Sequence, residues 1–447
     1  MENTILLSQK NCPVAGEYDV VVCGGGPAGI GAAIAAAKNG ASVAIVDRFG
    51  GFGGLATLGQ TTNCEGGVYL SGDKQLIGGV FEEFLNSLLE KKGALRGNDL
   101  IQNHIFYACD ESRCENDLQI VMVEVETFKQ AADEFMDKYG VDVYFFTMIT
   151  DVVMDGSKIQ GIIIDNKNGK QILLGKQFVD CTGEAWVANK AGAETILPNP
   201  KAPIELNFRA AGIRNVIDSY QGNMKELPYG AVNFFPLPHS NHFRFEMTRY
   251  LGNSAEADDL STAMVECRKQ VPVLINWLKE NWSGCENMFL LDSAEWIGCM
   301  AYRTVVGEHQ LTIKESLELK IPEDSVLLSG YGVDLHSHEE GGQNHLIYLQ
   351  PGQCFGIRYG CLIPKTPTDN ILVAGRAISR EPGVGTELIA VTMSTGEAAG
   401  TACALSIKNN VKPRDLDVTV LREQLLAQGV LLQPKPAAKF DGYYLQR

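Results

Sequence analysis

The stretch DVVVCGGGPAGIGAAIAAAKNGASVAIVDR, residues 19–48, decides the fold. It opens with a short apolar run typical of a β-strand and passes into three consecutive glycines. An alanine-rich segment then continues to Lys38, and a second apolar run ends at Asp47. We interpret this order as strand, glycine turn, helix, strand and acid, which is the βαβ unit that binds a dinucleotide.

The glycines of this unit have separate physical tasks. Gly24 allows the tight turn off the strand, Gly26 lets a pyrophosphate approach the backbone, and Gly29 lets the helix pack against the strand. The free N–H groups at the helix N-terminus favour an anion at this point. The predicted phosphate-binding residues are therefore Gly24, Gly26, Pro27, Ala28 and Gly29. The alternative is a purely structural βαβ turn, but the strand, spacing, helix and acid all favour binding.

The acid and the loop behind it distinguish between cofactors. Asp47 lies at a strand end, where a carboxylate can accept hydrogen bonds from ribose hydroxyls, and we assign Arg48 to the same site. A second glycine-rich loop, RFGGFGGLATLGQ at residues 48–60, follows at once. It resembles the flavoprotein superfamily that includes glutathione reductase. That resemblance implies cofactor contacts for the loop residues Gly53, Gly54, Ala56 and Thr57.

Two distant segments resemble the same superfamily. GKQFVDCTGEAWVANKAGAE, residues 175–194, is similar to its second flavin motif, which implies cofactor roles for Thr182 and Gly183. TDNILVAGRAISREPGVGTELIAVTMSTGEAAGTACAL, residues 368–405, is similar to its C-terminal motif. There the implied contacts are Gly375, Arg376 and the helix start near Leu388. Ile149 falls where the superfamily meets the adenine.

The chain as a whole resembles the FAD-dependent oxidoreductases related to the fumarate reductase and succinate dehydrogenase flavoprotein, over about residues 17–430. Further matching stretches are AYRTVVGEHQLT at 301–312 and YGVDLHS at 331–337. The resemblance implies FAD as the cofactor, and we expect it to be non-covalent. The alternative of a covalent link would involve Cys64 or His104.

The expected fold is α/β, with a Rossmann-like FAD-binding domain of the glutathione reductase type and an inserted α+β substrate or cap domain. We expect a discontinuous FAD domain at 1–62, 120–195 and 340–410. Residues 63–119 are predicted as a helical insertion and 196–339 as the cap domain. Residues 411–447 should form a C-terminal helix and tail.

Composition excludes several classes of function. The net charge is −16 with a pI near 5.0 and no basic run, so nucleic acid is not an expected partner. The first 17 residues lack a signal peptide pattern and no long apolar run exists, so we expect a cytoplasmic protein without membrane contact. The twelve cysteines include no CxxC pair, which argues against a metal centre. Cys109 and Cys114 are closest in spacing; unrelated thiols are favoured over a redox disulfide.

The expected reaction is hydride transfer to or from a small organic substrate at a C–OH/C=O or C–C/C=C centre. Our candidates for catalysis are His336 as acid or base and Arg303 as a clamp for a carboxylate or hydroxyl. The chain has Glu387 where relatives usually carry an arginine, so a sugar, polyol or ketone is favoured over a dicarboxylate. NAD(P)H or an electron-carrier protein could be the redox partner, and a homo-oligomer is left open. An electron-transfer component or structural use of FAD are the alternative functions.

Overall fold

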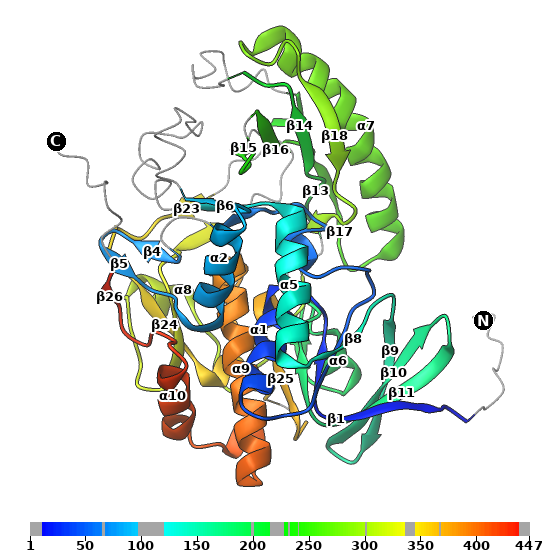
Figure 1. Ribbon diagram of the computed structural model, residues 1–447, viewed down its shortest axis with the longest axis vertical. Helices are drawn as coiled ribbons and strands as arrows, with labels where there is room; N and C mark the ends of the chain where they lie inside the picture. Colours follow the sequence, from blue (N-terminus) through cyan, green and yellow to red (C-terminus); the bar gives the residue numbers. More distant parts are fainter. Residues whose placement is uncertain are drawn as a thin grey trace.

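The computed structural model describes most of the chain, namely residues 11–64, 68–96, 120–197, 201–214, 228–230, 233–239, 241–299, 302–335, 345–365 and 368–437. Figure 1 shows a lower part, where helices lie beside a central sheet, and an upper part in which a long helix covers a smaller sheet.

The central sheet has a parallel core whose strand order is the Rossmann order 3-2-1-4-5. Strand β1 lies in the middle, between β2 and β11. The core strands are, across the sheet, β8 (Asp142–Tyr144), β2 (Val43–Val46), β1 (Val14–Cys23), β11 (Gly169–Asp180) and β25 (Ile371–Val373). The predicted α/β class with a Rossmann-like core is therefore confirmed.

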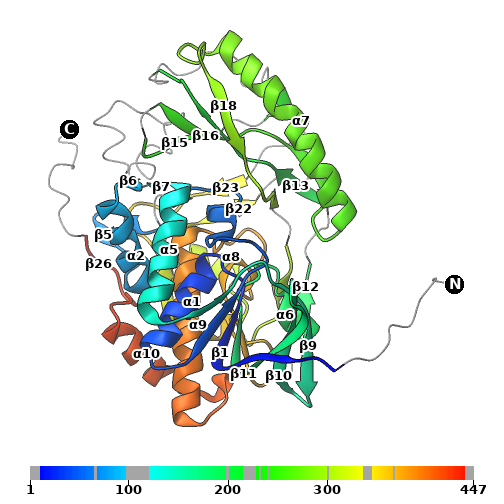
Figure 2. The same ribbon diagram turned by 45° about the vertical axis from the view of Figure 1, so that its right-hand side comes forward.

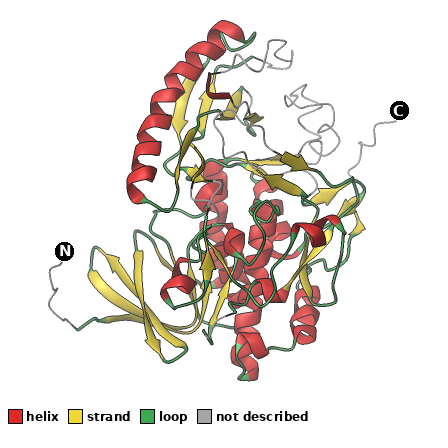
Figure 3. Ribbon diagram, turned by 180° about the vertical axis from the view of Figure 1, so that it is seen from behind, coloured by secondary structure: helices red, strands yellow, loops and turns green. Residues whose placement is uncertain are grey.

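A three-stranded antiparallel meander extends this sheet at one edge. It consists of β9 (Met148–Asp155), β10 (Lys158–Asn166) and the first half of β11. Gly169 adopts a φ of +84° at the hairpin turn between β10 and β11. Figure 3 shows from behind how the meander extends away from the helical layer.

The two faces of β1 pack against different layers. Val20 and Val22 belong to the main core with the helices, whereas Val21 and Cys23 face the core of the meander. The helical layer contains α1 (Pro27–Lys38), α2 (Gly79–Glu90), α5 (Val125–Tyr139) and α9 (Ile389–Asn409). The short helix α6 (Trp186–Lys190) packs with the meander instead.

Helices α1 and α9 pack at unusually close range because glycines face the backbone of the partner helix. A Cβ atom at Gly396 would lie 1.9 Å from the carbonyl oxygen of Ala28, and one at Gly400 would lie 2.1 Å from that of Ala32. A Cβ at Gly31 would lie 2.1 Å from the Met393 carbonyl oxygen. Only glycine permits this approach, so the first and last motifs of the chain are locked side by side.

The cap is built on a four-stranded antiparallel sheet with the order β15-β16-β14-β18. The side chains of β16 alternate between two faces: Phe243 and Phe245 are in the core under the long helix α7 (Ala257–Asn281), and Arg244 lies on the other face. Figure 2 shows α7 lying along this sheet. The cap strands are β14 (Phe208–Ala211), β15 (Asn233–Pro236), β16 (His242–Glu246) and β18 (Phe289–Ser293).

Short elements connect the two parts. In the predicted helical insertion the described residues form α2 and four short strands, and α2 packs in the layer of α1, α5 and α9.

None of the helices in the described ranges is long and apolar enough to cross a membrane. The remaining elements are β3 (Asn63–Cys64), β4 (Leu70–Ser71), β5 (Lys74–Gln75), β6 (Ala94–Arg96), β7 (Val121–Val123), β12 (Thr195–Ile196), β13 (Lys201–Glu205), β17 (Tyr250–Asn253), β19 (Gly298–Cys299), β20 (Thr304–Val305), α8 (Ile313–Leu317), β21 (Ser325–Ser329), β22 (Val333–Leu335), β23 (His345–Ile347), β24 (Phe355–Arg358), α10 (Val418–Ala427) and β26 (Lys435–Pro436).

Candidate active site

The first glycine turn has the geometry that a pyrophosphate needs. Gly24 has a φ of +108°, and a Cβ atom there would lie 2.5 Å from the Cys181 carbonyl oxygen. A Cβ at Gly29 would lie 1.8 Å from the carbonyl oxygen of Gly24, so the helix can start this close to the strand only with glycine. At Gly26 the space around a Cβ is open, and Pro27 begins α1 directly behind it. The open side of the turn therefore faces the N-terminus of α1.

Asp47 closes the turn from the end of β2. Its Oδ2 accepts a hydrogen bond from Gly25 N at 2.6 Å, and its Oδ1 accepts one from Phe49 N at 2.8 Å. Burial raises the pKa of Asp47, although these two donors act in the opposite direction. Arg48 stacks on the ring of Trp296, with 3.9 Å between the guanidinium carbon and the ring centroid. Ribose binding by Asp47 stays a prediction; each carboxylate oxygen retains a further lone pair for it.

The second glycine loop folds back onto the first. Gly53 donates its N–H to the carbonyl oxygen of Gly25 at 2.8 Å. A Cβ at Gly54 would lie 3.2 Å from the Cα of Gly26. Ala56 is buried, and the Thr57 hydroxyl donates to the Phe52 carbonyl oxygen at 2.6 Å. The loop thus lies beside the first glycine turn, and its cofactor contacts stay a prediction.

The second motif is organised by Asp180, which sequence reasoning missed. Its Oδ1 accepts from the Thr182 hydroxyl at 2.6 Å and from Thr182 N at 3.0 Å, while Oδ2 accepts from Ala188 N at 2.8 Å. Burial raises the pKa of this completely buried carboxyl. The hydroxyl and the backbone N–H of Thr182 are therefore used within the turn, and cofactor contacts of Thr182 and Gly183 stay a prediction. The signal was the acid two residues before the threonine.

The third motif meets the first at Ala28. Gly375 has a φ of +79°, and a Cβ there would lie 3.0 Å from the Cβ of Ala28. The Arg376 guanidinium turns toward the second motif, because its Nε donates to the Gly183 carbonyl oxygen at 2.9 Å. The three glycine-bearing segments, far apart in the chain, thus converge at one place. Ile149 lies on β9, two residues after Thr147, whose N–H donates to the Asp47 carbonyl oxygen at 3.0 Å.

The packing of α1 on α9 shows which way an extended cofactor would run. Ala28 faces Gly396 and Ala32 faces Gly400, so the two helices run in parallel. Ala28 is the second residue of α1, whereas Gly396 is the eighth residue of α9, so α9 extends about 9 Å beyond α1. Its N-cap, Leu388, is therefore roughly two helical turns past the phosphate turn. That the flavin end of FAD would lie near Leu388 and its adenine end near Asp47 stays a prediction.

A compact polar cluster lies at this far end, and we call Tyr302, Arg380 and Glu387 the Tyr302 cluster. Arg380 Nη2 donates to the Tyr302 hydroxyl in a very short contact and lies 3.3 Å from Glu387 Oε2. The Tyr302 hydroxyl in turn donates to Glu387 Oε2 at 3.4 Å. The ring of Tyr302 packs under the guanidinium of Arg376, at 4.3 Å from the centroid. The cluster therefore joins the third motif to the N-terminus of α9.

The cluster is buried and not fully satisfied. Arg380 is 6 % exposed and Tyr302 is also 6 % exposed, whereas the Glu387 side chain is 29 % exposed. Arg380 Nη1 donates to the Val384 carbonyl oxygen at 2.7 Å. Arg380 Nε and Thr386 Oγ1 are buried without a hydrogen-bond partner among the described residues. Buried donors of this kind call for an acceptor from a bound molecule or water.

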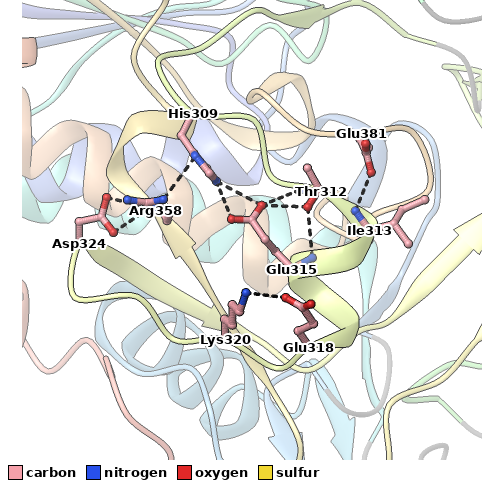
Figure 4. Close-up of polar contacts among 9 residues, drawn as sticks. All are labelled: His309, Thr312, Ile313, Glu315, Glu318, Lys320, Asp324, Arg358 and Glu381. Atoms are coloured by element: carbon pink, nitrogen blue, oxygen red, sulfur yellow. Dashed lines mark hydrogen bonds and ion pairs between the residues drawn. The ribbon is translucent and has the colours of Figure 1, made fainter.

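A second polar network involves Glu381, the residue that follows Arg380 (Figure 4). The segment of Leu311 pairs with that of Arg380, since Glu381 N donates to the Leu311 carbonyl oxygen at 2.8 Å. Ile313 N at the start of α8 donates to Glu381 Oε2 at 2.7 Å. Two residues earlier than Leu311, His309 Nε2 lies 3.0 Å from Glu315 Oε1.

His309 lies at the centre of this network, as Figure 4 shows. Arg358 Nη1 lies 3.5 Å from His309 Nδ1, and Arg358 Nε donates to both oxygens of Asp324 at 2.8 and 2.9 Å. Because a guanidinium only donates, Nδ1 accepts, and Nε2 carries the proton that faces Glu315. Burial raises the pKa of Glu315, but the hydrogen bonds that it accepts from Thr312 and His309 lower it more, so the net shift is downward.

The cap presents a polar face to the segment after the second glycine loop. The guanidinium of Arg244 is completely buried; its Nη1 donates to Asn63 Oδ1 at 2.6 Å. Asn207 Nδ2 donates to the Gly59 carbonyl oxygen at 2.7 Å, and Gln60 Nε2 donates to Asp292 Oδ1 at 2.9 Å. The cap is therefore tied to the same loop that folds over the phosphate turn.

Of the two predicted catalytic residues, Arg303 is described by the structure and His336 is not. His336 lies outside the described residues, as do His104, Cys109 and Cys114. Arg303 is half-buried and directly precedes β20, next to the Tyr302 cluster. The structure places Tyr302 rather than Arg303 in contact with Arg380. Cys64, the other candidate for a covalent link, is buried.

Comparisons with known proteins agree with this architecture. A model of the FAD dependent oxidoreductase family matches residues 19–425. The match spans all three of the glycine-bearing segments that converge at Ala28. No curated protein matches the chain in sequence.

Solved structures provide similarities of fold at low identity. A geranylgeranyl bacteriochlorophyll reductase-like protein from Thermoplasma acidophilum is 15% identical, with 92% of this chain and 83% of that chain covered and a TM-score of 0.47. A p-nitrophenol 4-monooxygenase from Pseudomonas putida is 13% identical over 92% of this chain and 84% of that chain, with a TM-score of 0.46. An anhydrotetracycline hydroxylase from Streptomyces rimosus is 13% identical over 92% of this chain and 65% of that chain, with a TM-score of 0.43.

Proposed function

Because the chain belongs to the FAD-dependent oxidoreductase family, we propose that it transfers a hydride between FAD and a small uncharged polar molecule at an alcohol or carbonyl carbon. A sugar, a polyol or a ketone fits this description. The finer relation to the fumarate reductase flavoprotein rests on the resemblance of the FAD-binding segments, and we do not extend it to a dicarboxylate substrate.

One observation carries the choice of an uncharged substrate: Arg380 and Arg376, the two arginines that contact Tyr302, are paired with carboxylates of the chain itself. Arg380 lies 3.3 Å from Glu387, Arg376 lies 3.6 Å from Glu184, and Arg249 lies 3.0 Å from Glu205. The same holds for two arginines of the cap sheet, Arg209 with Asp292 and Arg244 with Glu246. A site that clamps a dicarboxylate needs guanidinium groups that keep their charge for the ligand.

Tyr302 is the group best placed to exchange the substrate proton. Oxidation of an alcohol removes a hydride from carbon and a proton from oxygen, and bound FAD supplies the hydride acceptor. Arg380 donates to the Tyr302 oxygen and would stabilise it after loss of its proton. Glu387 accepts from the same hydroxyl and is partly exposed, so it offers the proton a way to solvent. Carbonyl reduction uses the same groups in reverse.

The test is anaerobic bleaching of the flavin in the purified holoprotein. We expect glycerol, sorbitol, glucose or a simple secondary alcohol to bleach the visible flavin absorbance. Bleaching should be much slower in Tyr302→Phe than in the wild type at equal FAD content. Succinate, malate and lactate serve as the charged comparison. Bleaching by these acids alone would overturn the proposal. Bleaching by NADH identifies the reductive partner, and reduction by a carrier protein alone would favour the electron-transfer alternative.

A further inference from the structure

The N-terminus of α9 carries an unusual charge arrangement for the flavin end of the site. A helix N-terminus has a partial positive charge that favours anions. Two-electron reduction of FAD with uptake of one proton leaves a negative charge on the cofactor, which this helix end would stabilise. The helix has no acidic residue in its first turn and no side-chain cap. Glu387, however, directly precedes the N-cap and brings a full negative charge to the same end.

The position of Glu387 is fixed from three sides through one oxygen. Oε2 accepts from Thr386 N at 3.0 Å and from Tyr302 at 3.4 Å, and it lies 3.3 Å from Arg380 Nη2. A carboxylate held this firmly cannot swing away when the charge beside it changes. The negative charge of Glu387 therefore stays at this place, and the positive charge of Arg380 offsets it.

Arg380 supplies the compensating charge from a buried position. Burial lowers the pKa of Arg380, and the charge of Glu387 raises it. The Nε of Arg380 and the Oγ1 of Thr386, which have no partner among the described residues, add two buried donors next to the pair. These donors indicate that a molecule with acceptor oxygens fills the adjacent space, which is what the flavin end of FAD provides.

We propose that the Arg380–Glu387 pair sets the electron affinity of the bound FAD, with Glu387 lowering it and Arg380 raising it. The pair cancels the charge that either residue alone would impose, so the cofactor can both accept and return a hydride. This inference rests on FAD at the N-terminus of α9 and not on the substrate proposed above. Its failure would therefore leave the choice of an uncharged substrate untouched.

The test measures the flavin itself and needs no substrate. The holoproteins of the wild type, Glu387→Gln, Arg380→Gln and Glu387→Asp are titrated with a reductant beside a reference dye to obtain the midpoint potential. They are also titrated with sulfite, which adds to oxidised flavin as an anion and is followed by loss of the visible absorbance. Both readouts respond to charge near the ring.

We expect Glu387→Gln to raise the potential and to tighten sulfite binding roughly tenfold or more. Arg380→Gln should shift both in the opposite direction, and Glu387→Asp should stay near the wild type. Glu318→Gln, in the exposed pair with Lys320, is the matched control with no expected change. Tyr302→Phe separates charge from packing, because it removes hydrogen bonds of the cluster without changing its charge. Equal potentials and sulfite affinities in Glu387→Gln and Glu318→Gln would overturn the proposal, even where Arg380→Gln fails to fold.

Discussion

Gly396 faces Ala28 so closely that a single methyl group on Gly396 would lie 1.9 Å from the Ala28 carbonyl oxygen. This contact joins a helix that starts at residue 27 to one that starts at residue 389. It also sets how far α9 reaches past the phosphate turn, and hence where the Tyr302 cluster stands. The position of the cluster therefore depends on a contact made entirely by backbone and small side chains.

We expect Gly396→Ala to destabilise the protein and to reduce its FAD content. The added methyl meets backbone rather than a flexible side chain, so the helices must separate, at a cost of about 1–3 kcal/mol or more. Thermal unfolding and the flavin-to-protein absorbance ratio measure both effects. An unchanged melting temperature would show that α1 and α9 can shift apart without penalty.

Gly26→Ala should separate cofactor binding from folding. Gly26 has a φ of −70°, and no atom lies within 4 Å of the position that an added methyl would take, so alanine fits the apoprotein. The methyl would occupy the side on which a pyrophosphate approaches the backbone, and we expect at least about tenfold weaker FAD binding. Titration of the apoprotein with FAD gives the affinity, with unfolding of the apoprotein as the control. Wild-type affinity would place the phosphates elsewhere.

Glu397 should make the protein less stable as the pH rises. Burial raises the pKa of Glu397 from 4.5 to about 7, although Val80 N donates to its Oε2 at 2.9 Å. The folded protein therefore binds a proton that the unfolded chain releases near 4.5. The stabilising contribution is complete below that pH and is lost as the pH rises through about 7.

The matched variant for this effect is Glu397→Gln, which keeps the shape and stays neutral. The wild type should lose up to about 3 kcal/mol relative to Glu397→Gln between about pH 5 and pH 8. Denaturant midpoints at the two pH values give the difference. Parallel curves for the two proteins would mean that the carboxyl titrates normally.

Tyr302→Phe should lower turnover by about 10²- to 10⁴-fold, the usual contribution of a positioned proton donor or acceptor. FAD content and melting temperature should stay close to the wild type, since only the hydroxyl is removed. Tyr139→Phe, which removes a half-buried hydroxyl that donates to Glu83, is the control. A full rate in Tyr302→Phe would transfer the role to another group, with Arg303 the first to test.

The sequence predicted the Rossmann-like fold of this protein because its signals are local. Glycine spacing, a strand before it and an acid after it lie within residues 19–48, and each motif is a short continuous stretch. The resemblance then gave the order of the three motifs. The strands β1, β2 and β11 and the turn at Gly24 follow from these patterns.

The polar groups of the Tyr302 cluster could not be predicted in this way. Tyr302 and Arg380 are separated by 78 positions, and no periodicity links them. The sequence did point to Glu387, because relatives usually carry an arginine at that position. It indicated a change in charge there, but it did not identify Arg380 as the residue that pairs with Glu387. Arg303 was chosen for its charge, whereas the adjacent uncharged Tyr302 makes the contacts. Asp180 was passed over because a buried hydrogen-bonding role leaves no pattern beyond its place before Thr182.

The close contact between α1 and α9 also affects how the chain folds during its synthesis. Residues 24–32 emerge from the ribosome early. The helix that covers them, residues 389–409, is synthesised more than 350 residues later. At about 5–20 residues per second the nascent chain waits roughly 20 to 70 s for that partner. During this interval the small, apolar side of α1 has no native cover, and β11 lacks β25. Synthesis of this protein therefore exposes its nucleotide-binding end to chaperones and proteases until almost the last helix emerges.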